Sequence, residues 1–118
     1  LAAFYHRLLK AVDREVFRSG QWSLCERSGW PDNRSFLNLL VWCWVKDNDR
    51  FLTMINYSDS AAQGLVRVPW DELRGKQWRL NDQLSAESYD RSGDDLRDNG
   101  LYVDLKPWGC HLFHVRAA

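Results

Sequence analysis

The chain has 118 residues, enough for one domain with a hydrophobic core, and its 16 basic and 16 acidic side chains leave no net charge. Nucleic-acid-binding proteins use a basic surplus to displace counterions, so we expect no nucleic-acid partner. Aromatic residues are abundant (seven Trp, five Phe and four Tyr), and flat rings suit either a well-filled β core or a surface that stacks on sugars.

The sequence predicts one amphipathic helix, over residues 1–17. Its apolar positions recur at steps of three and four residues, and they are Phe4, Tyr5, Leu8, Leu9, Val12 and Val16. Ser19-Gly20 ends the helix, because glycine readily adopts the left-handed turn past a helix end. A lone amphipathic helix needs a surface to cover, so we expect it to pack on this domain's sheet or on a preceding domain.

Short apolar runs separated by turn residues follow from Gln21, which is typical of an antiparallel β-sandwich. The longest runs, 36–45 and 51–57, flank the polar segment 46–50 and predict a hairpin at the centre of the sheet. Each run is too short to span a bilayer, so we expect no membrane partner. Further strands are expected at 21–26, 63–69, 76–81, 101–105 and 110–116, with short edge strands around 86–89 and Leu96. The predicted fold class is all-β, a sandwich of seven or eight antiparallel strands after one N-terminal α-helix.

Three cysteines, Cys25, Cys43 and Cys110, cannot all pair within one chain, and each lies among apolar strand residues. We expect them to be buried thiols, which favours a cytoplasmic location. No signal peptide is visible. The chain begins at Leu1-Ala2-Ala3 without an initiator Met, so we expect it to be a piece of a longer protein.

No motif for catalysis, a metal or a cofactor emerges. His111 and His114 are three residues apart on a predicted strand, where side chains face opposite sides, and no Cys-x-x-Cys pair exists for zinc. Residues 47–49 resemble the start of a calcium loop but lack its later Gly and Glu, so a turn is the better interpretation. The adjacent acids Asp71-Glu72 and Asp94-Asp95 do not form the facing pair of a glycosidase. We therefore predict no catalytic residue, no metal and no cofactor.

Two tryptophans, Trp30 and Trp108, lie in predicted loops beside prolines, where an exposed indole could stack on a sugar. Trp42 and Trp44 share one face of the central strand and favour packing against the other sheet or a neighbouring domain. The residues expected in the core or an interface are Phe4, Leu8, Trp42, Trp44, Ile55, Tyr57, Leu105 and Phe113.

Four segments together resemble a known family. They are FYHRLLKAV at 4–12, SGQW at 19–22, RFLTMINYSDSAAQGLVRVP at 50–69 and GLYVDLKPWGCHLFHV at 100–115. In this order they resemble the last barrel helix and the C-terminal domain of α-amylase-family (glycoside hydrolase family 13) enzymes. The resemblance covers nearly the whole chain. Cys110 departs from it, since the family often has an aromatic residue there.

The resemblance implies an eight-stranded antiparallel Greek-key sandwich packed on a catalytic (β/α) barrel that acts on α-glucans such as starch or glycogen. The family's catalytic residues lie on that barrel, and none of their motifs occurs here, so this chain is expected to be non-catalytic. Residues 1–18 then correspond to the barrel's last helix and 19–118 to the C-terminal β-sandwich domain. The barrel is the expected partner. The expected function is to stabilise that barrel and to aid polysaccharide binding. An autonomous carbohydrate-binding module and an unrelated protein-interaction sandwich are the alternatives.

Overall fold

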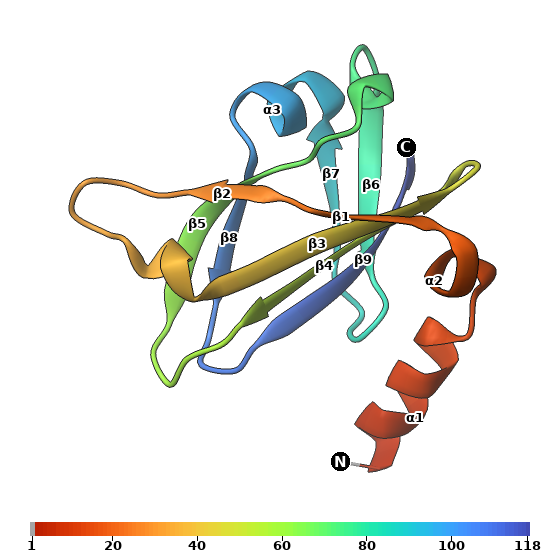
Figure 1. Cartoon of the computed structure of the whole chain (residues 1–118), viewed down its shortest axis with the longest axis horizontal. Coiled ribbons are helices and arrows are strands. Elements are labelled where there is room, and N and C mark those ends of the chain that lie inside the picture. Colours follow the sequence, from red (N-terminus) through yellow and green to blue (C-terminus); the bar gives the residue numbers. More distant parts are fainter. Residues whose placement is uncertain (1) are drawn as a thin grey trace.

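The computed structural model describes residues 2–118, with only the backbone at Tyr5, so Leu1 and the Tyr5 side chain lie outside the described residues. Within them, nine strands form two antiparallel sheets, flanked by three α-helices and two 3-10 helices (Figure 1). The strands are β1 (Gln21–Leu24), β2 (Glu26–Ser28), β3 (Leu39–Lys46), β4 (Asp49–Asn56), β5 (Ala62–Arg67), β6 (Gln77–Asp82), β7 (Ser88–Ser92), β8 (Leu101–Leu105) and β9 (Cys110–Ala117). The helices are α1 (Ala2–Val12), α2 (Glu15–Ser19), α3 (Gly93–Asp98), η1 (Ser35–Asn38) and η2 (Asp71–Leu73). The predicted all-β sandwich with an N-terminal helix is confirmed.

The larger sheet has the order β1-β3-β4-β9-β6-β7 and the smaller one β2-β5-β8. The predicted central hairpin is β3 and β4, which pair from Leu39↔Asn56 to Lys46↔Asp49 around a tight turn. The last strand, β9, inserts between β4 and β6, the kind of non-sequential order that Greek-key connections produce.

The core lies between the two sheets. Alternate residues of β3 and β4 point inward, as period-two patterning requires, and Leu39, Leu52 and Met54 are fully buried. The smaller sheet contributes Ala62, Val66, Leu101, Val103 and Leu105 to the same core. This closed interior occupies only one face of the larger sheet.

A polar side chain, Asn56 at the end of β4, is also fully buried. Its amide nitrogen donates to the backbone carbonyls of Ser60 (2.7 Å), Leu105 (3.1 Å) and Lys106 (3.1 Å), and its oxygen accepts from the Ser58 hydroxyl (2.8 Å). Asn56 therefore joins the β4–β5 turn to the β8–β9 loop and gives the buried carbonyl of Leu105 a donor.

The predicted N-terminal helix is broken at Asp13, and Arg14 adopts an extended conformation (φ −140°, ψ 148°) before α2 begins. The break places the Arg14 guanidinium 5.0 Å from the Phe51 ring centroid and 3.5 Å from the Asp49 carboxylate. The break also lets Val16 of the predicted stripe pack against Phe51 and Leu112 from α2. In Figure 1, α2 lies beside the sheet while α1 projects away from the sandwich.

The strand expected around Leu96 is wrong, because Leu96 is a buried residue of helix α3. The Ser92 hydroxyl caps this helix by accepting from the Asp95 backbone N–H, and Asp94 and Asp95 stand in its first turn, where acids favour helix formation. The predicted strand 21–26 is likewise divided at Cys25, where the chain passes from the larger sheet to the smaller one.

The three cysteines are free thiols, buried at Cys25 and Cys43 and half-buried at Cys110. Among the described helices, none combines the length and the apolar character needed to cross a lipid bilayer.

Candidate interaction surface and binding cleft

The outer face of the larger sheet is strongly apolar. Its register places Trp22 beside Trp44, Leu24 beside Trp42, and Leu40 beside Ile55. We call these six residues the outer apolar face. Trp22, Leu24 and Leu40 are 50%, 69% and 45% exposed, whereas Trp42, Trp44 and Ile55 are half-buried. A contiguous apolar surface of this kind is typical of a surface that another domain or protein covers.

Helix α2 covers only one end of the sheet. Phe17 contacts the rings of Phe51 (centroids 4.8 Å apart) and Trp44 (5.7 Å), and Val16 is 1% exposed. Phe51 points to the outer side yet is fully buried beneath this cover. The remainder of the outer face has no comparable layer among the described residues.

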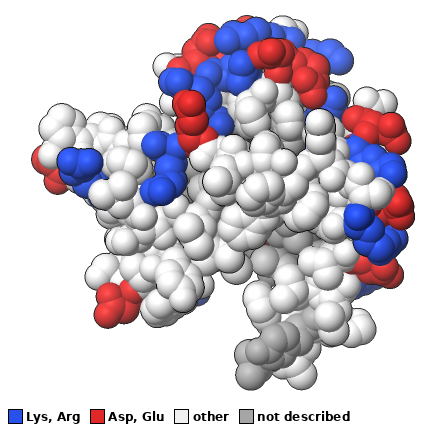
Figure 2. Space-filling model, in the orientation of Figure 1, with Lys and Arg blue, Asp and Glu red and all other residues white. Residues whose placement is uncertain are grey.

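Helix α1 and the sheet enclose a groove of about 490 Å³ with an almost entirely apolar lining. Phe4, Leu8 and Val12 line it from the helix, and Trp42, Trp44 and Ile55 line it from the sheet. Figure 2 shows the molecule hollowed between its body and the α1 lobe, while charged side chains gather around α3 and along the α1–α2 side. The predicted residues Phe4, Leu8, Trp42, Trp44 and Ile55 thus meet at one open groove.

At the α1–α2 junction, Arg14 contacts a polar cluster that includes Asp49 and His114. The Asp49 carboxylate lies 2.8 Å from His114 Nε2 and 3.5 Å from Arg14, and the His114 ring stacks on Phe51 at 4.5 Å. Burial lowers the pKa of His114 below its ordinary value, and the positive charge of Arg14 lowers it further. The hydrogen bond that His114 donates to the Asp49 carboxylate raises this pKa but does not outweigh burial. His114 is therefore held toward its neutral form.

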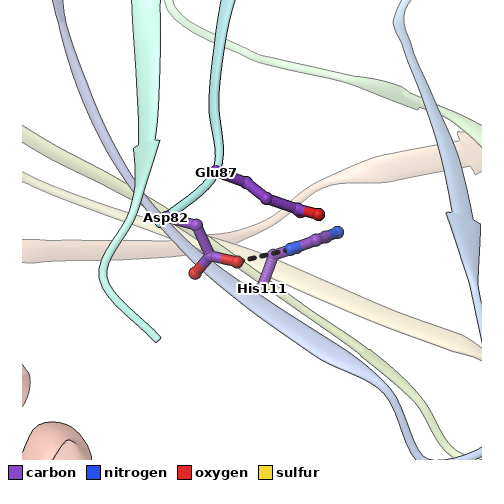
Figure 3. Close-up of side chains that lie close together, drawn as sticks. All are labelled: Asp82, Glu87 and His111. Atoms are coloured by element: carbon purple, nitrogen blue, oxygen red, sulfur yellow. Dashed lines mark hydrogen bonds and ion pairs between the residues drawn. The ribbon is translucent and has the colours of Figure 1, made fainter. Parts of the chain in front are cut away.

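A second concavity, of about 610 Å³, opens between the β6–β7 turn and the β8–β9 loop, and we call it the cleft. At its base Asp82 Oδ2 lies 2.7 Å from His111 Nδ1, with the Glu87 carboxylate close to both (Figure 3). Asp82 also accepts from the backbone N–H groups of Leu84 (3.0 Å) and Leu112 (3.2 Å). Burial alone would raise the pKa of Asp82, but the hydrogen bonds from His111 and these N–H groups outweigh it and lower that pKa.

Trp108 and Lys106 line the cleft from the β8–β9 loop, and Asp104 lines it from β8. Its side chain is 59% exposed and makes an edge contact with Tyr57, at 5.3 Å between centroids. The backbone of Trp108 is left-handed (φ 58°), which is a strained conformation for a bulky residue. The chain thus holds an exposed indole at a concave, polar surface.

Trp30 has different surroundings. It is half-buried in the β2–η1 loop, forms a bridge with Asn33, and lies 6.1 Å from the ring of Tyr102. The two predicted stacking tryptophans therefore lie in different loops and contact different tyrosines, and of the two only Trp108 lines the cleft. Of the other predicted residues, Leu105 and Phe113 lie in the core and Tyr57 is 67% exposed.

Sequence reasoning did not find the grouping of Asp82, Glu87 and His111. As predicted, His111 and His114 do not share a site, since they contact Asp82 and Asp49 respectively. The only local signal was the turn 82–87, in which Asp82 accepts from the Ser85 hydroxyl (3.1 Å) and the Leu84 N–H, a common arrangement of Asp in turns. The approach of β9 to this turn is a long-range feature.

No protein-family model matches the chain, and no curated protein sequence matches it. Solved structures do match. A noncanonic maltogenic α-amylase, AmyB from Thermotoga neapolitana, superposes with a TM-score of 0.67 at 9% identity, over 97% of this chain and 25% of that one. The trehalulose synthase MutB from Pseudomonas mesoacidophila MX-45 gives 0.60 at 13% identity, over 97% and 17%. The chain spans a quarter or less of these enzymes, and the likeness establishes a shared fold.

Proposed function

We propose that this chain is the non-catalytic C-terminal accessory domain of an α-amylase-like (glycoside hydrolase family 13) enzyme that acts on α-glucans, and that it stabilises the catalytic barrel. The observation that carries the proposal is the outer apolar face with its open groove, a surface suited to a neighbouring domain. The sequence resemblance and the partial match to larger sugar-converting enzymes support the same assignment.

The groove specifies how the barrel would dock. Helix α1 presents Phe4, Leu8 and Val12 toward the sheet but leaves space between them, so apolar side chains of a preceding domain would fill it. In this arrangement α1 belongs to the barrel and α2 forms the joint, since Phe17 and Val16 pack firmly on the sheet while Leu9 on α1 is 68% exposed. Residues 1–18 would then be the last barrel helix and its exit.

Hydrogen exchange of this chain, alone and within its longer parent chain, tests the proposal. We expect α1 amides to exchange rapidly in the isolated chain and to be protected in the parent, because the barrel would cover the helix. The isolated chain should not cleave maltoheptaose, whereas the parent should. Full protection of residues 4–16 in the isolated chain, or unchanged protection in the parent, would contradict the assignment.

A matched pair of variants sharpens the test. Leu24→Ser, on the outer apolar face, should lower the stability of the parent enzyme while barely affecting the isolated chain, since Leu24 is 69% exposed there. Tyr102→Ser, at a 56% exposed position of the smaller sheet, should affect both proteins equally little. If Leu24→Ser changes neither protein, the partner binds elsewhere.

Glucan binding is a second candidate, favoured by the exposed and strained Trp108 beside the polar groups of the cleft. Titration with maltoheptaose, followed by Trp fluorescence and NMR shifts, should give saturable changes that Trp108→Ala removes and Trp30→Ala keeps. No change at millimolar sugar would reject this function and leave the structural one.

A further inference from the structure

The cluster of Asp82, Glu87 and His111 has a donor set that the accessory function does not use (Figure 3). One ligand atom from each side chain lies within 4.8 Å of the other two, and no other such group occurs among the described residues. One imidazole nitrogen and two carboxylates suit Zn²⁺ and its neighbours in the first transition row. We propose that these three side chains form a divalent-metal site, with Zn²⁺ as the best-fitting ion. The proposal is independent of the function above.

Backbone hydrogen bonds fix the positions of the chain segments that carry the three ligands. The Asp82 N–H donates to the Glu87 carbonyl (2.9 Å), which closes the β6–β7 turn and places both acids on the same side of it. Strand β9 is fixed against the turn by the Gln83 N–H to Leu112 carbonyl bond (2.8 Å) and by the Leu112 N–H to Asp82 bond (3.2 Å). Three chain segments therefore bring the donors together without a ligand, which lowers the entropic cost of binding.

Side-chain motion completes the geometry. Zn²⁺ bonds to N and O donors are about 2.0–2.2 Å long, so ligand atoms around a tetrahedral ion stand a little over 3 Å apart. Asp82 and His111 are already adjacent, and Glu87 is the exposed member that can move toward them. Tyr89 donates to Glu87 Oε2 (2.9 Å), which orients the carboxylate and leaves Oε1 as a ligand atom. Buried, hydrogen-bonded Asp82 supplies the fixed side of the site.

The ion would replace the proton between His111 Nδ1 and Asp82, with the neutral ring carrying its single proton on Nε2. Three protein ligands leave a fourth position for water on the tetrahedral ion. The cleft provides room for that water.

The pair formed by His114 and Asp49 provides an internal control for the proposed site. His114 and Asp49 form an equivalent pair, at 2.8 Å, but Arg14 lies 3.5 Å from that carboxylate where the cleft has Glu87. A guanidinium repels a divalent cation and a carboxylate attracts it, so the two His–Asp pairs should differ sharply in metal affinity.

Calorimetric titration of the chain with Zn²⁺, together with His side-chain NMR, tests the site. We expect one saturable site, with shifts centred on His111, and a higher melting temperature in its presence. Glu87→Gln, at an exposed position, and His111→Asn should each weaken binding at least about tenfold, as loss of a ligand requires. His114→Gln should leave it unchanged. Co²⁺ should give visible absorption that only the first two variants lose.

Three results would overturn the proposal. The first is the absence of saturable binding at millimolar Zn²⁺. The second is unchanged affinity in Glu87→Gln when its melting temperature shows that it remains folded. The third is loss of binding in Cys110→Ser with retention in Glu87→Gln, which would assign the ion to the half-exposed thiol beside His111.

Discussion

On the inner face of the larger sheet, Leu52 and Met54 of β4 are completely buried, whereas Ile55 on the outer face of the same strand is only half-buried. The smaller sheet closes the first face. The second is closed at one end by Phe17 and remains open elsewhere. Both faces carry large apolar side chains, so composition does not explain the difference. The inner face is completed within this chain, and the outer face is suited to completion by another domain.

The largest expected effect is the loss of stability on truncating an inner-face residue, compared with truncating an outer-face residue of the same strand. Leu52→Ala should destabilise the chain by about 3 kcal/mol, because it opens a cavity in a closed core. Ile55→Ala, on the same strand, should cost about 1 kcal/mol, since water already reaches its side chain. Urea unfolding of both variants measures the difference. Equal losses would mean that the outer face is as well packed as the core.

Substitutions at Asn56 test whether its buried amide holds together the two loops at one end of the core. Asn56→Ala should cost about 2 kcal/mol, because it removes a fully buried amide that donates to the buried carbonyl of Leu105 and to the carbonyl of Ser60. Ser58→Ala removes a half-buried hydroxyl that donates to the Asn56 oxygen and to the Ser60 carbonyl, and it should cost less than half as much. If thermal unfolding shows similar losses for both variants, the buried amide is not what joins the two loops.

The pH dependence of stability tests the environment of His114, which lies at the α1–α2 junction on the outer face. Since burial lowers the pKa of His114, the unfolded chain binds a proton more readily than the folded one below pH ~6.5. The contribution of His114 to stability should therefore fall as the pH drops through this range and should stay constant above it. His114→Gln should flatten the slope of the unfolding free energy between pH 5 and 7. A slope unaffected by this variant would place the titrating group elsewhere.

The fold could be predicted because it depends on local signals. The alternation in 101–105 and the apolar run before the 46–50 turn specify strands wherever they pack, and the structure has β8, β3 and β4 there. Leu96 was mispredicted because one apolar residue among acids gives no period, while the Ser92 cap that defines its helix is a weaker signal.

The candidate sites depended less on local signals. Trp108 could be predicted as a loop indole, but the cleft beside it forms only when the β6–β7 turn meets the β8–β9 loop. Asp82 and His111 are 29 residues apart, and their contact follows from the β6–β9 pairing that sets Asp82 opposite Phe113. No pattern in the sequence specifies that register, so the cluster could not be predicted from it.

The smallest expected effect concerns α1. Deleting residues 1–12 should change the unfolding free energy of the isolated chain by less than about 1 kcal/mol, because Phe4 and Val12 are each 40% exposed and Leu9 is 68% exposed. Among the described side chains of α1, only the small Ala11 is buried. Phe17→Ala, in α2, should cost about 2 kcal/mol, since its ring buries Phe51. Urea unfolding of both variants makes the comparison. A loss on deletion as large as that of Phe17→Ala would show that α1 already closes the outer face, and the groove would then need no further domain to fill it.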